Sequence, residues 1–563
     1  MEKTQVLAWN GYAAWLLVFG CSLGLFSQTA RRGFTWIEQG AEQEQLAVEA
    51  RSAAAEPSEI EAHVTFDPAT RCIIGTARLW FDPPAAARSF ALDDDLAVDS
   101  VLTGGAAVRL FRRDHRVFLA GSGLKNVLVC FSGRLPLWDA QEKQLVGHAK
   151  VPAPSSGADN FLMLQTDSLA FLPSSCLRFA RSRVTVHVPA CCNCLGSGIR
   201  RELPARSGMN AFSFDSIASR GFMLICGDFQ RRDRLEGALP LNFFGSPQLD
   251  LKSCRDALKM RGVVDFFCRR FGRLIVPELN ILLCRAGFQG GISQIGCIVC
   301  FFNPDDVGKK LEELERLRRE SPVFLHDPRC DCLVHEIAHQ WWGGLCSWSR
   351  RADGWITEGL AQFSTLLYLH GQLPEEEFTS ILERLGSWVE RYNGAGKVTE
   401  NMRLTLIRRD PLCAQAIIYN RSTLILWMLH ELLGEEEMIS RLRNLLAERQ
   451  SSGWSTPAFC ARMAGNDPLL LGFFDSWVGR ADLPAIRCRL SSQGRSVRLA
   501  IEQVNGTFVF PLQLVSRSPA GARVRSLIVS REREEFEFLL TDSPLNAGIV
   551  RGAAPVRVTL LPE

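Results

Sequence analysis

The chain has 563 residues, of which 47% are hydrophobic and 22% are charged, and its formal net charge is +3. This composition is typical of a folded globular protein and excludes a disordered or fibrous chain. Its length predicts two to four domains, because one hydrophobic core rarely grows beyond about 250–300 residues. The near balance of 64 basic and 61 acidic residues gives no reason to expect nucleic acid as a partner.

The chain begins with an apolar segment and a polar linker. Residues 4–30 contain no charged side chain, and basic residues flank them on both sides. Residues 1–32 therefore predict either a secretory signal peptide or an uncleaved membrane anchor, and the sequence leaves both open. Residues 33–58 are polar and rich in Ala and Glu, and they are predicted to be a linker or a short helix. Either alternative predicts a protein outside the cytoplasm, secreted or anchored to a membrane through its N-terminus.

Residues 59–235 are predicted to form an N-terminal β-rich domain. Runs such as Glu61–Phe66 and Ser182–Val188 alternate apolar with polar residues, and turn residues separate such runs at short intervals. Regular short strands of this kind are typical of an all-β domain.

Residues 236–482 combine helical and strand patterns. An amphipathic pattern predicts a helix over 250–272, apolar runs predict strands over 274–284 and 296–302, and helical patterns dominate the rest. Residues 483–563 return to short strands and are predicted to form a small C-terminal β-sandwich. The predicted fold class is therefore multidomain α+β.

Nineteen cysteines are spread along the chain. They include the run Cys191-Cys192-Asn193-Cys194 and a CxxC motif from Cys297 to Cys300. The CxxC motif lies in an apolar, strand-like run, which argues against the redox motif that begins a helix. Most of the cysteines are expected to be buried as small apolar side chains, and the pattern assigns no disulfide.

The segment from residue 331 to residue 362 carries the chemistry. His335, Glu336 and His339 form an HExxH motif, and residues four apart on a helix share one face, with about 5–6 Å between their Cβ atoms. Two imidazoles can then bind one metal ion while the Glu336 carboxylate takes a proton from metal-bound water. A zinc ion that keeps a position open for water needs a third protein ligand. Glu358, with eighteen residues between it and His339, is predicted to supply it.

A second helix is predicted to carry Glu358. Its apolar residues include Leu360 and Phe363, and either Asp353 or Thr357 is predicted to cap its N-terminus. Packing of this helix against the first would bring Glu358 to the two imidazoles. HExxH alone is a weak signal, and the second carboxylate at this spacing makes it specific.

The run from His335 to Ala361 resembles the gluzincin aminopeptidase family, which includes aminopeptidase N and leukotriene hydrolase. Family members typically read HExxHQWFGNL and then WLNEGFA after a gap of this length, and this chain reads HEIAHQWWGGL and WITEGLA. The resemblance implies a thermolysin-like catalytic domain over residues 236–482. It also implies one zinc ion per chain, bound by His335, His339 and Glu358, with Glu336 as the general base.

The resemblance also implies an oxyanion-binding tyrosine. The family supplies it from a Y-x-K-G helix start, and Tyr419 lies sixty-one residues after Glu358 at the start of an apolar helical pattern. Arg421 and Ser422 depart from the usual Lys-Gly. The alternative is a core tyrosine whose hydroxyl group reaches the surface.

The substrate-binding strand of the family reads G-A-M-E-N, and its glutamate anchors the free α-amino group of a substrate. Here Gly291, Ile292, Ser293 and Gln294 take the Ala, Met, Glu and Asn positions. Ser293, or Gln294 if the register shifts by one, replaces the glutamate, and a neutral group attracts an ammonium ion far less than a carboxylate does. The strand is still expected to bind extended substrate backbone, with Gln165 lining the same cleft.

These residues predict a zinc metallopeptidase of aminopeptidase type that hydrolyses peptides or small proteins, with its exopeptidase preference in doubt. Two alternatives stay open. One is a catalytically silent scaffold that binds peptides or partners, and the other is a zinc hydrolase acting on a non-peptide substrate. The sequence leaves the side-chain preference and the oligomeric state undetermined.

Overall fold

The structure is a computed structural model of the chain. It describes residues 54–562 apart from 83–86, 114, 121–123, 136–160, 167–169, 176–179, 220, 238, 247–256, 286–289, 303–308, 393–395, 400–409, 449–452, 519–520 and 540–545. The predicted signal or anchor segment and most of the predicted linker lie outside these residues. The chain divides into two compact units. One covers residues up to 314, 327–349 and 449–453, and the other covers 315–326, 350–448 and 454–563.

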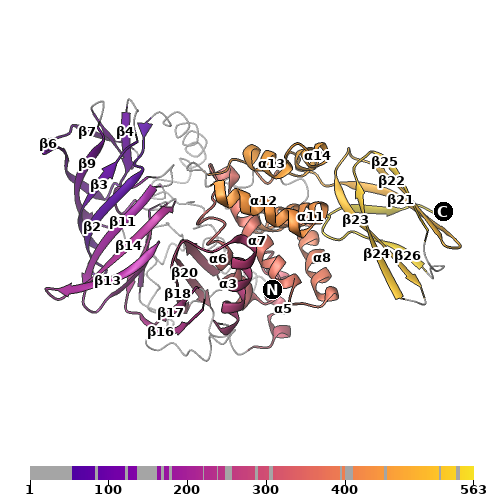
Figure 1. The fold of residues 1–563 in the computed structure, drawn as a ribbon, viewed down its shortest axis with the longest axis horizontal. Helices are drawn as coiled ribbons and strands as arrows, with labels where there is room; N and C mark the ends of the chain where they lie inside the picture. The colour runs from indigo at the N-terminus through magenta and orange to yellow at the C-terminus, as the bar shows by residue number, and fades with distance from the viewer. Residues whose placement is uncertain are drawn as a thin grey trace, which may run out of the picture. The chain divides into compact units, whose positions relative to one another are not determined.

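An eight-stranded sheet dominates the β-rich part of the first unit (Figure 1). Its strands, in spatial order, are β13 (Ile199–Arg206), β14 (Met209–Ser219), β11 (Ala180–Pro189), β2 (Glu59–Asp67), β3 (Cys72–Trp80), β9 (Asn126–Arg134), β5 (Leu96–Thr103) and β6 (Ala106–Ala107). Neighbours are antiparallel except β2 and β11, which are parallel. In β2 the alternate residues Ile60, Ala62, Val64 and Phe66 are buried, so period-two hydrophobicity sets the buried face of the sheet.

Two smaller sheets complete this β-rich region. One contains β1 (Ala54–Ala55), β4 (Ala87–Ala91), β8 (Arg116–Leu119) and β7 (Leu110–Arg113). The other contains β10 (Phe161–Gln165), β15 (Met223–Gly227) and β12 (Asn193–Gly196). The predicted β-rich N-terminal region is confirmed.

A five-stranded mixed sheet follows in the same unit. Its spatial order is β16 (Gln230–Leu235), β17 (Leu241–Gly245), β18 (Leu279–Arg285), β20 (Cys297–Phe302) and β19 (Gly290–Gln294). β19 is an edge strand and runs antiparallel to β20. Helix α6 (Pro328–Ala338) packs against β19 and β20, and helix α3 (Ala257–Phe271) packs against α6. One face of the β10–β15–β12 sheet shares a core with this sheet, through residues such as Ile225 and Ile292.

The second unit contains α5, which precedes α6 in the chain, and the helices that follow α6 (Figure 1). They are α5 (Glu315–Glu320), α7 (Trp355–His370), α8 (Glu375–Arg391), α10 (Pro411–Gln415), the π-helix η7 (Ala416–Arg421), α11 (Ser422–Leu433), α12 (Glu435–Glu448), α13 (Thr456–Ala464) and α14 (Pro468–Trp477). α7 is buried along almost its whole length and packs against η7 and α11. In the described part of the chain, no helix combines the length and apolar character needed to cross a membrane.

The C-terminal strands form two small sheets. One contains β25 (Arg533–Leu539), β22 (Ser496–Gln503), β21 (Ala485–Gln493) and β27 (Arg557–Leu560), and the other contains β24 (Gly521–Val529), β23 (Phe510–Ser518) and β26 (Asn546–Val550). In β22 the alternate residues Val497, Leu499 and Ile501 are buried, as a strand with one buried face requires. The strands, with the helical and β-rich regions before them, confirm the multidomain α+β class.

Candidate metal centre and active site

Helix α6 presents two of the predicted site residues, and a third follows at its end. His335 and Glu336 lie in α6, whereas His339 comes directly after its last residue, Ala338. The His339 N–H still donates to the His335 carbonyl oxygen at 3.1 Å, so the helical spacing continues through His339. The two imidazole centroids are 4.5 Å apart. The HExxH geometry predicted from the sequence is therefore present.

Helix α7 carries Glu358 in its first turn, but neither predicted side-chain cap forms. Gly354 occupies the N-cap position and no side chain accepts a capping hydrogen bond there. The buried Asp353 carboxylate instead accepts hydrogen bonds from the Thr456 N–H and hydroxyl, both at 2.8 Å. The Thr357 hydroxyl donates to the Gly354 carbonyl at 3.1 Å. The capping prediction is wrong because the Asp353 carboxylate is hydrogen-bonded to Thr456, at the start of α13 about a hundred residues later.

The structure brings His335, His339 and Glu358 together. One ligand atom from each lies within 4.8 Å of the others, and among the described residues they are the only such group. All three side chains are buried, with at most 5% of their surface exposed. Two imidazoles and a carboxylate are the donor set of catalytic zinc sites, which keep one position for water. The arrangement therefore fits one Zn²⁺ ion.

A hydrogen bond orients the second imidazole. His339 Nδ1 lies 2.7 Å from the Trp342 carbonyl oxygen. Because a carbonyl oxygen can only accept, Nδ1 carries the proton in this bond, and Nε2 is left with its lone pair for a metal ion. Trp342 is itself fully buried, so the carbonyl that sets this tautomer belongs to a fixed part of the chain.

Glu336, the predicted general base, lies against the edge strand β19. A Cβ atom built on Gly291 would lie 2.3 Å from Glu336 Cγ and 2.8 Å from Glu336 Oε1. The next residue, Ile292, is fully buried in the core below the strand. The structure thus places the predicted substrate strand directly beside the predicted base.

Gln340 holds this strand in place, a role that the sequence analysis missed. It is fully buried, and its Oε1 accepts the Gly296 N–H at 2.8 Å. Its Nε2 donates to Ser293 Oγ at 2.7 Å and to the Gln294 carbonyl oxygen at 2.9 Å. Ser293 therefore offers a neutral hydroxyl, already held by Gln340, where the family has glutamate. The signal available in the sequence was Gln340 itself, a polar residue directly after the metal-binding His339.

The structure tests Gln165 only in part. Its backbone belongs to β10 and pairs with Met223, which fixes its place in the sheet. Its side chain lies outside the described part of the structure. The predicted role of Gln165 in lining the cleft therefore stays a prediction.

Tyr419 lies in the π-helix η7 and is 3% exposed. η7 packs against α7, the helix that carries Glu358. A Cβ atom built on Gly359 would lie 2.7 Å from Ser422 Cβ, so α7 and α11 approach each other closely beside Tyr419. The predicted contact of Tyr419 with an oxyanion stays a prediction.

Arg421, where the family pattern has lysine, is buried and binds the end of α14. Its guanidinium donates to the carbonyl oxygens of Arg480 and Ala481 at 2.6 Å each, and of Trp477 at 3.3 Å. Burial lowers the pKa of Arg421 to about 10, so the group remains charged at neutral pH. The planar guanidinium reaches several carbonyl groups at once, which a lysine ammonium group does with less geometric fit.

The model of the peptidase family M1 domain matches residues 329–477, a range that contains both histidines, Glu336, Glu358 and Tyr419. Residues 329–477 are therefore similar to an M1 peptidase domain, and this match covers less than half of the chain. The match confirms, for this range of residues, the resemblance to a peptidase family that the sequence predicted. The match does not cover the strands before residue 329 or the C-terminal sheets.

Curated relatives match part of the chain. Endoplasmic reticulum aminopeptidase 2 of Bos taurus is 28% identical over 146 residues, which is 24% of this chain and 15% of that protein. Endoplasmic reticulum aminopeptidase 2 of Homo sapiens is 27% identical over 108 residues, which is 19% of this chain and 11% of that protein. The chain thus spans a small part of the length of these relatives.

Solved structures share the fold over most of the chain. Aminopeptidase A of Legionella pneumophila, in complex with aspartic acid, aligns with a TM-score of 0.65 and 14% identity, over 89% of this chain and 59% of that one. A mutant M1 zinc metallopeptidase from Deinococcus radiodurans aligns with a TM-score of 0.59 and 17% identity, over 77% and 96%. The same mutant bound to a Tyr-Ser-Ala substrate aligns with a TM-score of 0.57 and 18% identity, over 77% of this chain and 95% of that one. These similarities establish the fold beyond the M1 domain.

Proposed function

We propose that the protein is a zinc-dependent peptidase of aminopeptidase type. The observation that carries the proposal is the buried group of His335, His339 and Glu358, with Glu336 beside it, in an M1 peptidase domain. A zinc ion held by these three ligands would polarise the scissile carbonyl group and acidify a water molecule. The proposal extends the aminopeptidase and metallopeptidase names of the similar proteins to this chain.

Glu336 acts as the general base in this proposal. Its carboxylate takes the proton of the attacking water and later passes it to the leaving amine. Glu336 is only 2% exposed, so bulk water competes little for its oxygens. Tyr419 donates a hydrogen bond to the oxyanion, and its burial in the M1 domain keeps its side chain in one conformation.

Substrate binds to β19 as an added strand. β19 is the edge of its sheet, and among the described strands only β20 pairs with it. An extended peptide can therefore pair with backbone groups of β19 on the other side. Gly291 lets this backbone lie close to Glu336, and Gln340 fixes the strand at Ser293 and Gln294. Gly291, Ile292, Ser293 and Gln294 are the proposed substrate-binding residues of this strand, and Gln165 is proposed to face them.

The absence of a carboxylate at Ser293 and Gln294 limits the exopeptidase proposal. A free α-amino group gains no ion pair from either residue, so we expect a weaker preference for free N-termini than in a typical aminopeptidase. The same observation supports the second candidate, a zinc-binding scaffold that holds peptides without turnover. The third candidate is a zinc hydrolase that acts on a non-peptide substrate, since the same zinc chemistry can hydrolyse other bonds.

Hydrolysis by the full-length chain tests these candidates. Aminoacyl amides and their N-acetylated counterparts are assayed before chelation, after chelation and after zinc is added back. Zinc-dependent cleavage of free substrates alone would establish an aminopeptidase, and equal cleavage of both would establish an endopeptidase. A protein that holds one zinc ion and cleaves neither contradicts the peptidase proposal and favours the scaffold or a non-peptide substrate.

Export is part of the proposal as well. Residues 4–30 would direct the chain to the secretory route, either as a removed signal or as an anchor. N-terminal sequencing of the soluble and membrane fractions separates the two, because only an anchored protein keeps this segment in the membrane. A protein found in the cytosol with its N-terminus intact would contradict both.

A further inference from the structure

Two buried cysteines lie directly opposite each other in the three-stranded sheet. Cys194 of β12 pairs with Cys226 of β15 in antiparallel register. The Cα atoms of directly opposed residues in an antiparallel pair are about 4.5–5.5 Å apart. Disulfides require Cα separations of about 4.4–6.8 Å. The backbone therefore already has the spacing of a cross-strand disulfide.

The side chains of this pair also face each other. The two Sγ atoms are 3.0 Å apart, and neither residue is exposed to solvent. An S–S bond is about 2.0 Å long, so a shift of about 1 Å in the sulfur positions would join them. We infer that Cys194 and Cys226 form a disulfide when the chain folds under oxidising conditions.

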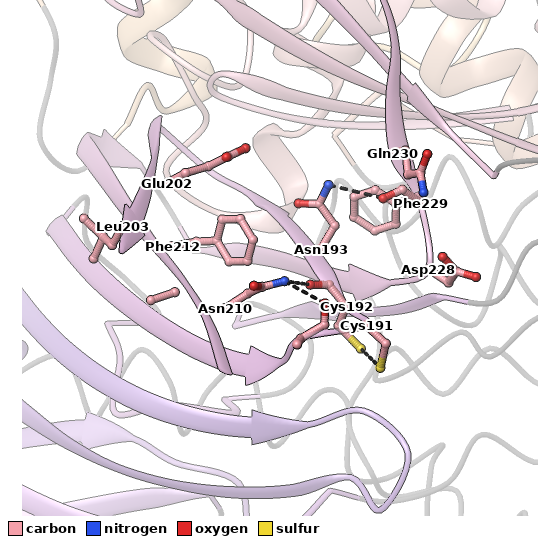
Figure 2. Close-up of a pocket in the computed structure, with 12 residues that line it drawn as sticks. Cys191, Cys192, Asn193, Glu202, Leu203, Asn210, Phe212, Asp228, Phe229 and Gln230 are labelled. Atoms are coloured by element: carbon pink, nitrogen blue, oxygen red, sulfur yellow. Dashed lines mark hydrogen bonds between the residues drawn. The ribbon is translucent and has the colours of Figure 1, made fainter. Parts of the chain in front are cut away.

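A second thiol pair lies close by but is less suited to cross-linking. Cys191 and Cys192 are neighbours in the chain, and their Sγ atoms are 3.9 Å apart (Figure 2). A bond between them would close a strained ring over a single peptide unit. They line a pocket of about 280 Å³ with Asn193 and Asp228, and Cys191 is exposed. This pair is thus accessible to reagents, whereas Cys194 and Cys226 are not.

The bond forms by thiol–disulfide exchange. One thiolate of the pair attacks an oxidant that contains a disulfide, such as oxidised glutathione or an oxidised exchange protein, and breaks its S–S bond. The second thiolate then displaces the remaining donor thiol and closes the Cys194–Cys226 bond. The chain loses two electrons and two protons, and the donor disulfide is reduced to two thiols. Burial raises the pKa of Cys226 well above its ordinary value in the folded chain, so exchange occurs before this sheet closes.

The cross-link would restrain a strand that supports the active-site strand. Gly198, two residues after β12, donates its N–H to the Ile295 carbonyl oxygen at 2.6 Å. The N–H of the next residue, Gly296, donates to Gln340 Oε1 at 2.8 Å. The chain segment after Cys194 therefore contacts the same turn that Gln340 holds. The inference rests on the thiol geometry and is independent of the proposed function.

Peptide mapping of the full-length chain tests the inference. The protein is folded with oxidised glutathione, denatured with excess alkylating agent and no reductant, digested, and analysed by mass spectrometry. We expect one linked peptide pair that contains Cys194 and Cys226 and that separates on reduction. Cys488, equally buried in β21, is the reference residue and should be alkylated. Complete alkylation of Cys194 and Cys226, or linkage of either one to Cys191 or Cys192, would overturn the inference.

Thermal unfolding gives an independent test. Reductant is expected to lower the Tm of the oxidised protein by roughly 2–6 °C, because the disulfide limits the entropy of the unfolded chain. The double variant Cys194→Ala/Cys226→Val roughly conserves the volume of the pair, and its Tm should not respond to reductant. The control variant Cys191→Ala/Cys192→Ala should keep the response of the unchanged chain. An undiminished response in Cys194→Ala/Cys226→Val would assign the effect to other cysteines and overturn the inference.

Discussion

Gly291 of strand β19 and the carboxylate of Glu336 touch so closely that no side chain fits between them. A Cβ atom on Gly291 would lie 2.3 Å from Glu336 Cγ and 2.7 Å from Glu336 Cδ. Glu336 is 2% exposed and has little room to withdraw. The absence of a side chain at residue 291, where the family pattern has alanine, therefore sets the position of the proposed base.

The substitution Gly291→Ala is expected to displace Glu336 and lower kcat by about 10- to 100-fold, since a misplacement of about 1 Å can cost about a hundredfold in rate. Zinc content should stay near one ion per chain, because the metal ligands are unchanged. The measurement is kcat together with metal analysis. Gly262→Ala in helix α3 is the matched control, because a Cβ there meets no atom within 4 Å. Unchanged kcat in Gly291→Ala would refute the positioning role.

The substitution Glu336→Gln removes the proposed proton acceptor while keeping the size of the side chain. We expect a loss of about a hundredfold or more in kcat, the usual scale for a general acid–base group. Zinc binding and the Tm should change little, because Glu336 is not one of the three ligands. Steady-state kinetics on the best substrate, with metal analysis of the same samples, provides the check. A fully active Glu336→Gln protein would exclude the proposed mechanism.

The close approach of α7 and α11 predicts a destabilising substitution and its rescue. A Cβ on Gly359 would lie 2.7 Å from Ser422 Cβ and 3.3 Å from Leu426 Cδ1, so Gly359→Ala pushes the two helices apart. Overpacking of this kind typically costs about 1–3 kcal/mol. Glu358 precedes Gly359 in α7, so zinc should also dissociate faster from this variant.

Adding Ser422→Gly to Gly359→Ala removes the Cβ atom that the new methyl group would meet, and it restores the glycine of the family pattern. We expect the double variant to recover most of the Tm and of the resistance to chelator. Ser422→Gly alone is the control, and its loss should be small compared with that of Gly359→Ala. A double variant that is no better than Gly359→Ala would show that the clash lies elsewhere.

The metal site could be predicted because its determinants are local. His335 and His339 are one helical turn apart, and Glu358 follows after a single reversal of the chain, so spacing alone fixes which side chains meet. Strand positions followed in the same way from alternation. Strand β22 spans Ser496–Gln503 in the region predicted to contain short strands, and its alternate residues Val497, Leu499 and Ile501 are apolar and buried.

The interactions that the sequence did not predict depend on contacts between residues that are far apart in the chain. Asp353 is a residue type that often caps helices, but its carboxylate accepts a hydrogen bond from Thr456, 103 residues later. Gln340 donates hydrogen bonds to Ser293 and Gln294, which lie in a strand 47 and 46 residues earlier. No local pattern encodes such pairings, because they appear only when the sheet and the helices pack together.

The π-helix before α11 and the role of Arg421 were missed for the same reason. The local pattern predicted a helix that starts at Tyr419, whereas α10, η7 and α11 follow one another in the structure. The acceptors of Arg421 lie 56 to 60 residues later, at the end of α14. A π-helical turn of this kind often occurs at a functional site, and here it carries Tyr419.

The raised pKa of Glu431 predicts that the free energy of unfolding depends on pH. Burial raises the pKa of Glu431 from 4.5 to about 7, although the Trp427 Nε1–H donates to its Oε1 at 3.1 Å. Between these two values the folded chain keeps a proton on Glu431 that the unfolded chain releases. Stability contributed by this proton is therefore present at low pH and is lost as the pH rises from about 4.5 through about 7. By linkage the loss is on the order of 3 kcal/mol above pH 7.

The variant Glu431→Gln lacks this titration and should be more stable than the unchanged chain above pH 7, by up to about 3 kcal/mol, and similar to it near pH 4.5. Burial also lowers the pKa of the neighbouring His430, which acts in the opposite direction, because its neutral form is lost as the pH falls. That term is common to both proteins and cancels in their difference. Denaturant unfolding from pH 4.5 to 8 measures the difference, and Glu436→Gln, at an exposed position of α12, is the control. A difference that does not grow with pH would show that Glu431 is charged in the folded protein throughout this range.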